Sequence, residues 1–162
     1  MKNEEFVNVV ERHKGIIYKV CYVYAGSRED AVDYFQDVVA QLWQAWPRFR
    51  GESSVSTWIY RVALYTCVSH MRKSSRRPGT VSLYPGCDAA GQDDERTEQV
   101  ERMYDMLSRL GNAEKALVLL WLEEKSYEEI AAITGLTRSN VAVKLMRAKD
   151  KLKKMYNDKK DE

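Results

Sequence analysis

Residues 126–145 read SYEEIAAITGLTRSNVAVKL, a stretch that predicts two helices joined by a tight turn. Ser126 and Glu129 have the spacing of a capping box, in which each side chain bonds to the other residue's backbone amide at a helix start. The apolar side of that helix is formed by Ile130, Ala131 and Ile133. Gly135 supplies the turn, because glycine tolerates the positive φ angle that such a turn requires. Together these features predict a helix-turn-helix.

The second of the two helices, which Thr137 is placed to cap, is strongly basic. Its predicted buried side consists of Val141, Leu145, Ala148, Leu152 and Met155. The basic residues of this helix are Arg138, Lys144, Arg147, Lys149, Lys151, Lys153 and Lys154, and Asp150 is the only acid among them. Such a concentration of positive charge suits the phosphates beside a DNA major groove, although a solvated surface helix is the alternative.

The composition describes a globular chain with little net charge. The chain has 162 residues, which is enough for one ordinary domain or two small ones. Of these residues, 44% are hydrophobic and 31% are charged, as is usual for a globular protein. The net charge is only +2, so any affinity for nucleic acid depends on where the basic residues lie. No apolar run approaches a membrane span, and the first residues lack the apolar core of a signal peptide. We therefore expect a cytoplasmic protein with no membrane contact of its own.

The cysteines give no indication of a metal site or a disulfide framework. Cys21, Cys67 and Cys87 form no CxxC pair, and only His13 and His70 accompany them. Cys21 and Cys67 fall in helical apolar patterns and are predicted to be buried thiols. Cys87 falls in a loop, where we expect it to be more exposed. We expect neither a metal nor a cofactor.

Helical periodicity runs through most of the chain, and no alternating strand pattern is present. Pro, Gly and Ser are dense in residues 73–92, where the apolar period is lost. The predicted fold is therefore all-α, with two small helical domains and a flexible linker between them. The predicted boundaries are a first domain over residues 1–75, a linker over 76–95, a second domain over 96–157 and a charged tail over 158–162.

A polar ridge lies on the predicted second helix, which Ser27 begins and Pro47 ends. The ridge consists of Asp33, Gln36 and Asp37, whose i, i+3, i+4 spacing places the three side chains together. A polar, acidic ridge on a helix that otherwise forms core suggests a surface on which another protein docks. A solvated helix face is the alternative.

A serine-rich loop and an aromatic, basic helix follow the ridge. The helix carries Trp58, Tyr60, Arg61, Tyr65, Arg72 and Lys73. Arginines beside aromatic side chains suit single-stranded nucleic acid, because bases stack on the rings and the backbone meets positive charge. A place in the core is the favoured interpretation of Trp58, and both interpretations stay open for Tyr60, Arg61 and Tyr65.

Three segments together resemble the extracytoplasmic-function (ECF) sigma factors of bacterial RNA polymerase. DAVDYFQDV, at residues 30–38, resembles the family's D-A-E-D-hydrophobic-x-Q-E/D-V. FRGESSVSTWIYRVA, at residues 49–63, resembles its F-R-G…S…T-W-[LI]-[YF]-R-[IV]-A. SYEEIAAITGLTRSNVAVKLMRAKDKL, at residues 126–152, resembles its S-Y-x-E-I-A…G and [LI]-x-R-A-[RK]-x-x-L pattern. The order and spacing of the three blocks match the family, and they lie on both sides of the linker.

The resemblance implies a role for each block. The first domain, sigma region 2, would dock on the beta-prime clamp helices of core polymerase through Asp33, Gln36 and Asp37. It would recognise and melt the minus-ten promoter element with Arg50, Ser53, Ser54, Ser56, Thr57, Tyr60, Arg61 and Tyr65. The second domain, sigma region 4, would bind the minus-thirty-five element as duplex with Arg138, Ser139, Asn140, Val143, Lys144 and Arg147. The family is also commonly held inactive by an anti-sigma factor, and its members initiate transcription without catalysis of their own.

Two other classes of protein are compatible with a helix-turn-helix. A conventional repressor or activator would need a sensing pocket or a dimer helix in the N-terminal half, where the sequence instead has the ridge and the aromatic, basic helix. An enzyme acting on nucleic acid would need a cluster of metal ligands or a nucleophile. Asp33 and Asp37 are candidates for such a cluster, but no convergent histidine or third acid is evident beside them in the sequence.

Overall fold

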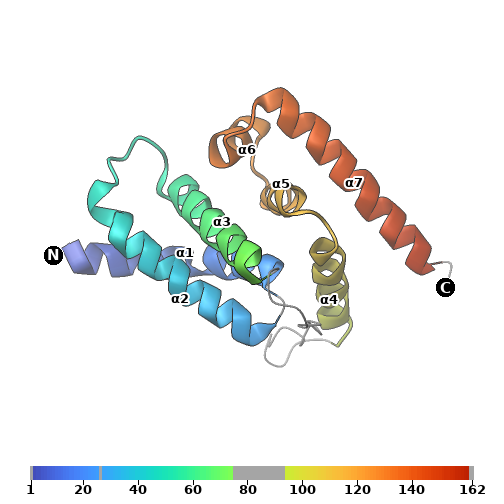
Figure 1. The fold of residues 1–162 in the computed structure, drawn as a ribbon, viewed down its shortest axis with the longest axis horizontal. Helices are drawn as coiled ribbons and strands as arrows, with labels where there is room; N and C mark the ends of the chain where they lie inside the picture. The colour runs from blue at the N-terminus through green and yellow to red at the C-terminus, as the bar shows by residue number, and fades with distance from the viewer. Residues whose placement is uncertain (1, 26, 75–93, 161–162) are drawn as a thin grey trace. The chain divides into compact units, whose positions relative to one another are not determined.

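The computed structural model describes residues 2–25, 27–74 and 94–160, and within these ranges the chain is helical with short connections and no strand (Figure 1). The described residues fall into two compact units, one within residues 1–82 and the other within residues 83–162. The predicted all-α fold with two helical domains is confirmed. Most of the predicted linker, with Cys87, lies outside the described residues.

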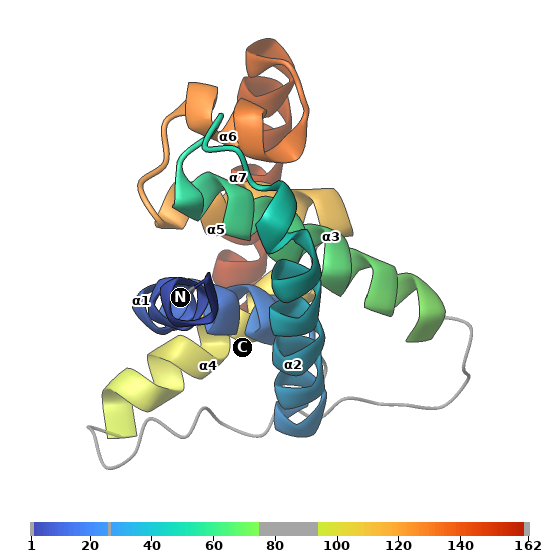
Figure 2. The same ribbon diagram turned by 90° about the vertical axis from the view of Figure 1, so that its left-hand side faces the viewer.

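The first unit is a bundle of three helices, α1 (Lys2–Tyr24), α2 (Arg28–Ala45) and α3 (Val55–Ser74). Each helix packs against the other two; α2 and α3 run antiparallel, and α1 crosses them (Figures 1 and 2). The side chains with no exposed surface at the centre are Ile17, Val20, Cys21, Ala31, Val38, Leu42, Ile59, Ala63 and Cys67. Their burial supplies most of the stabilisation that this small unit can obtain.

Local signals place the ends of α2 as predicted. The hydroxyl of Ser27 accepts a hydrogen bond from the amide of Asp30 at 3.1 Å, which caps the first turn. The α-helix ends at Ala45, and a single 3-10 turn, η1 (Trp46–Arg48), contains Pro47 and leads into the serine-rich loop. Proline stops the helix because it has no amide hydrogen to donate.

The two cysteines of the first unit are buried free thiols, as predicted. Their Sγ atoms lie 3.9 Å apart, one on α1 and the other on α3. The hydrogen bond to Cys21 and the burial of the site both raise the pKa of Cys67 far above its ordinary value. Both thiols therefore contribute to the unit as small apolar groups.

The second unit consists of α4 (Asp94–Ser108), α5 (Asn112–Leu122), α6 (Tyr127–Thr134) and α7 (Arg138–Lys160). Helix α5 contacts the other three, and its residues from Lys115 to Leu120 are all buried, which confirms the predicted central helix. Burial lowers the pKa of Lys115, whose side chain is a cation in an otherwise apolar row. Helix α7 continues through residues that the sequence assigned to a charged tail.

Helix α5 ends in a Schellman motif formed around a glutamate. The amide of Lys125 donates to the carbonyl of Leu120 at 3.1 Å, and the amide of Glu124 donates to the carbonyl of Trp121 at 3.0 Å. Glu124 has φ +62°, and it is the only non-glycine residue with positive φ among those that the structure describes. Glycine usually occupies this position because a Cβ atom is strained there.

Replacing Glu124 by glycine is expected to raise the free energy of unfolding of the second unit by about 0.5–1 kcal/mol, since it relieves that strain. The matched control is Glu123→Gly, one residue earlier at φ −82°, where no strain exists to relieve. The control should lower the free energy of unfolding by a similar amount, because glycine adds entropy to the unfolded chain. Urea denaturation of both variants measures the difference, and a shift in the same direction for both would contradict the argument.

Candidate nucleic-acid interface

The helix-turn-helix has the predicted geometry at both of its helix starts. The hydroxyl of Ser126 accepts a hydrogen bond from the amide of Glu129 at 3.1 Å, and the carboxylate of Glu129 accepts one from the amide of Ser126 at 3.4 Å. Gly135 ends α6 at φ +78°, and the hydroxyl of Thr137 then accepts from the amide of Asn140 at 3.1 Å. These caps end α6 at Gly135 and begin α7 after Thr137, so the turn between the two helices is short and its helix ends are hydrogen-bonded.

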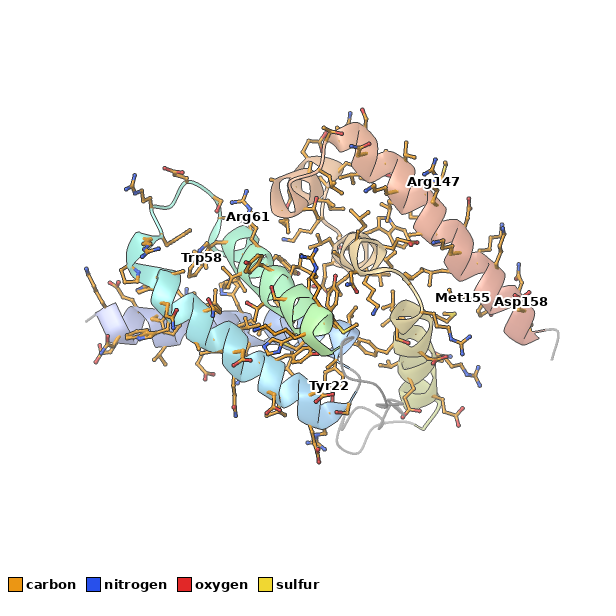
Figure 3. The ribbon with its side chains drawn as sticks, viewed as in Figure 1. Tyr22, Trp58, Arg61, Arg147, Met155 and Asp158 are labelled. Carbon is orange, nitrogen blue, oxygen red and sulfur yellow. The ribbon has the colours of Figure 1, made fainter. Side chains whose placement is uncertain are left out.

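All six residues predicted to read duplex DNA lie exposed on the N-terminal half of α7, and Figure 3 shows Arg147 pointing away from α5 and α6. Val141, Leu145 and Ala148 are buried beneath them, while Leu152 and Met155 are only half-buried. The structure also exposes Met146, at 58% of its surface, between Val143 and Arg147. An exposed, mixed apolar and cationic face of this kind fits base edges and phosphates in a major groove.

The cations of α7 differ in what they contact. Lys149 lies 3.9 Å from the ring centre of Trp121, and Lys151 is 2.8 Å from the carboxylate of Glu114, so both contact α5. Arg138 pairs with Glu128 of α6 at 2.8 Å across the turn. Lys144 and Arg147, by contrast, are exposed on the outer side of the helix. The sequence pattern predicts one surface formed by all seven basic residues. In the structure, at least two of them, Lys149 and Lys151, contact α5 and help to hold α7 against it.

The loop before α3 borders an open pocket of about 600 Å³. Its lining includes Arg48, Phe49, Arg50, Glu52, Ser53, Trp58 and Arg61. Trp58 and Arg61 project from the start of α3, next to the loop (Figure 3). The volume lies within the range of about 300–1,000 Å³ that small-molecule sites occupy. With three arginines and two aromatic rings, the pocket suits a planar group attached to a phosphate.

A cluster of aromatic rings supports this pocket from below. Trp58 packs on Phe49 with ring centres 4.8 Å apart and on Trp46 at 5.8 Å, and Phe6 of α1 contacts Trp46 at 5.8 Å. Trp58 is half-buried, so it packs against these rings and also lines the pocket. The packing of these rings holds η1, the loop and α3 together and so stabilises the residues that line the pocket.

Other residues predicted for this surface have structural roles. Ser54 caps α3, because its hydroxyl accepts from the amide of Thr57 at 3.2 Å and contacts the hydroxyl of Thr57 at 2.9 Å and that of Ser56 at 3.3 Å. Thr57 is buried beneath this cap. Tyr60 is only 1% exposed, so its ring lies in the core of the unit and not on the predicted DNA surface. Tyr65 is 77% exposed on the same helix.

The polar ridge of Asp33, Gln36 and Asp37 is exposed along α2. Asp37 also contacts α3, where its Oδ2 atom pairs with Nε2 of His70. The packing of α2 on α3 brings His70 beside the ridge, a neighbour that the sequence alone does not indicate. No group of three or more potential metal ligands is found among the described residues.

Comparison with known proteins identifies both units. Residues 9–77 match the family model for Sigma-70 region 2, and residues 101–152 match the one for Sigma-70 region 4. The RNA polymerase sigma factor YlaC of Bacillus subtilis is 32% identical over 141 residues, covering 83% of this chain and 82% of YlaC. The chain belongs to the ECF sigma factor family.

Other similar proteins agree with this family assignment. The ECF RNA polymerase sigma factor SigG of Mycobacterium tuberculosis is 38% identical over 79 residues, which are 48% of this chain but only 21% of the length of SigG. The sigma factor RpoE of Bartonella quintana, solved with the anti-sigma factor NepR, has the same fold with a TM-score of 0.72 at 20% identity, covering 96% of each chain.

The region 2 match contains the ridge, the loop and α3, and the region 4 match contains the helix-turn-helix. Sequence reasoning missed Arg48 and His70 in the first region. Arg48 directly precedes the quoted F-R-G motif, so a signal for it was present. His70 had no such signal.

None of the described helices is long and apolar enough to cross a membrane.

Proposed function

We propose that this ECF sigma factor binds core RNA polymerase through its first unit and directs it to promoters through both units. The observation that carries this proposal is the coexistence of two nucleic-acid surfaces with different chemistry in one chain. One is the exposed face of α7, which suits duplex DNA, and the other is the arginine-lined pocket beside the loop, which suits an unstacked base.

The pocket supports a role in opening the minus-ten element. Extracting a base from a duplex costs a few kcal/mol, which contacts to the flipped base can offset. Arg48, Arg50 and Arg61 line the pocket and can bind the flanking phosphates, and exposed Tyr65 lies further along α3, where a second base can stack. Ser53 lies at the pocket wall, whereas Ser54, Ser56 and Thr57 act by holding the loop on α3.

The face of α7 supports recognition of the minus-thirty-five element as duplex. Arg138, Ser139 and Asn140 lie at the N-terminal end of the helix, which is the end that reaches base edges in a helix-turn-helix. Val143, Lys144 and Arg147 follow one and two turns later on the exposed side. A conventional regulator would use this face as well, but it would leave the pocket and the ridge on the first unit without a role.

The partners follow from the same assignment. The ridge on α2 is proposed to dock on the beta-prime clamp helices of core polymerase. The proposed role is a cytoplasmic one, and it requires no catalysis by the chain itself. Because the RpoE relative was solved with the anti-sigma factor NepR, we extend control by an anti-sigma factor to this chain.

The deciding experiment combines the purified protein with core RNA polymerase and a promoter library. A stable complex and transcripts with defined start sites are expected. The double variant Asp33→Ala, Gln36→Ala should weaken core binding by about 1–2 kcal/mol, because it removes exposed polar contacts from the interface. Its affinity for duplex DNA should be unchanged, because the proposed duplex-binding side chains lie on α7, in the second unit.

The matched control is Glu5→Ala with Asn8→Ala, which also removes one acid and one amide, three residues apart, from an exposed helix surface. These residues precede the region 2 match, so core affinity should stay at the parent level. Absence of any complex between the parent protein and core polymerase would refute the proposed function. An equal loss in the ridge variant and the control would remove the ridge from it.

A further inference from the structure

His70 is held against the docking ridge by two contacts from one helix. Its Nε2 atom pairs with Oδ2 of Asp37, and its ring stacks on Tyr34 with ring centres 4.6 Å apart and an angle of 25° between the planes. Tyr34 and Asp37 are three residues apart on α2, so both face the same stretch of α3. Tyr34 is buried and supplies a fixed surface for the imidazole.

The pair lies at the edge of the unit, where it is partly solvated. The side chain of Asp37 is 51% exposed and that of His70 is 31% exposed. A side-chain contact with this much water around it adds little to folding stability. Its larger effect is on the conformation of Asp37, because a carboxylate held by a stacked imidazole samples fewer rotamers than a solvated one.

The contact with His70 is made through Oδ2 of Asp37. The Asp37 side chain keeps half of its surface exposed, so a donor on a partner protein can reach the carboxylate. Binding costs less when an interface side chain is already ordered, since the rotamer entropy has been lost on folding. A pre-ordered carboxylate also presents its oxygens in fixed directions, which favours one geometry of docking.

We propose that His70 is a positioning residue for the polymerase-docking surface: it orders the exposed Asp37 carboxylate for contact with the partner. The proposal rests on the proposed docking of the α2 ridge on core polymerase. His70 acts through Asp37 and touches the partner only indirectly. It lies 33 positions along the chain from Asp37 and joins the surface solely because α3 packs on α2.

Two substitutions separate the two contacts of His70. His70→Phe keeps a flat ring on Tyr34 and removes the donor to Asp37, while His70→Gln keeps an amide NH₂ near the position of Nε2 and loses the ring. The affinity for core RNA polymerase is measured for each full-length variant, together with its free energy of unfolding. His70→Phe should weaken core binding about two- to tenfold with stability near the parent value, as expected for one side chain that must be ordered on binding. His70→Gln should restore core affinity to within about twofold of the parent protein.

The Asp37→Ala background completes the test. Asp37→Ala should itself weaken core binding, and adding His70→Phe to it should produce no further loss, because the two residues act as one unit. If Asp37→Ala weakens core binding but His70→Phe does not, the positioning role is overturned while the docking surface stands. Equal losses for the Phe and Gln variants, in step with lowered stability, would also overturn it. If neither Asp37→Ala nor the Asp33, Gln36 variant changes core affinity, the docking surface fails and the positioning role fails with it.

Discussion

Replacing Tyr60 by alanine is expected to lower the free energy of unfolding of the first unit by about 3–5 kcal/mol, the usual cost of deleting a buried aromatic ring. Tyr60 is 1% exposed and lies on α3, which packs against both other helices of the unit. The substitution would leave a cavity in that packing. Chemical denaturation, followed by the fluorescence of Trp46 and Trp58, measures the loss.

Tyr65→Ala is the matched control, because it removes the same side chain from the same helix where 77% of the residue is exposed. We expect its free energy of unfolding to stay within about 0.5 kcal/mol of the parent value. Its affinity for single-stranded minus-ten DNA in the polymerase complex should instead fall by about 1–3 kcal/mol, the contribution of one stacked base. A stable Tyr60→Ala protein that opens promoters poorly would reverse this assignment and return Tyr60 to the DNA surface.

Helical periodicity in the sequence distinguishes the buried Tyr60 from the exposed Tyr65. Tyr60, Ala63, Leu64 and Cys67 recur at i, i+3, i+4 and i+7, which is the pattern of a buried helix face, and all four are buried. Tyr65 falls outside that pattern. The residue types alone left both interpretations of Tyr60 open, and the family resemblance placed it on the DNA surface without regard to its position on the helix.

Features set by neighbouring residues could be predicted, and features set by packing could not. The capping box at Ser126, the glycine turn at Gly135 and the cap at Ser27 each depend on a few consecutive residues, and the structure has all three. The pairing of His70 with Asp37 and the contact of Lys149 with Trp121 join residues far apart in the chain. Such contacts depend on how helices cross, which local patterns do not specify.

The double substitution Lys144→Ala, Arg147→Ala is expected to weaken binding of the full-length protein to minus-thirty-five duplex by about 2–5 kcal/mol. The two side chains project from the outer face of α7, and each contact to a base or a neighbouring phosphate contributes about 1–3 kcal/mol. The slope of log affinity against log salt concentration should also become shallower by about two, since two fewer counterions are released. Fluorescence anisotropy at several salt concentrations provides both quantities.

Lys153→Ala with Lys154→Ala is the matched control for charge, because it removes two exposed cations from the same helix beyond the proposed recognition residues. It should change affinity by less than about 1 kcal/mol and should affect cognate and unrelated duplexes alike, as long-range attraction to phosphates does. The Lys144, Arg147 variant should lose more affinity for cognate than for unrelated DNA. If both double variants lose the same affinity on every sequence, α7 binds DNA through its net charge alone, and the assignment of base reading to its N-terminal half is wrong.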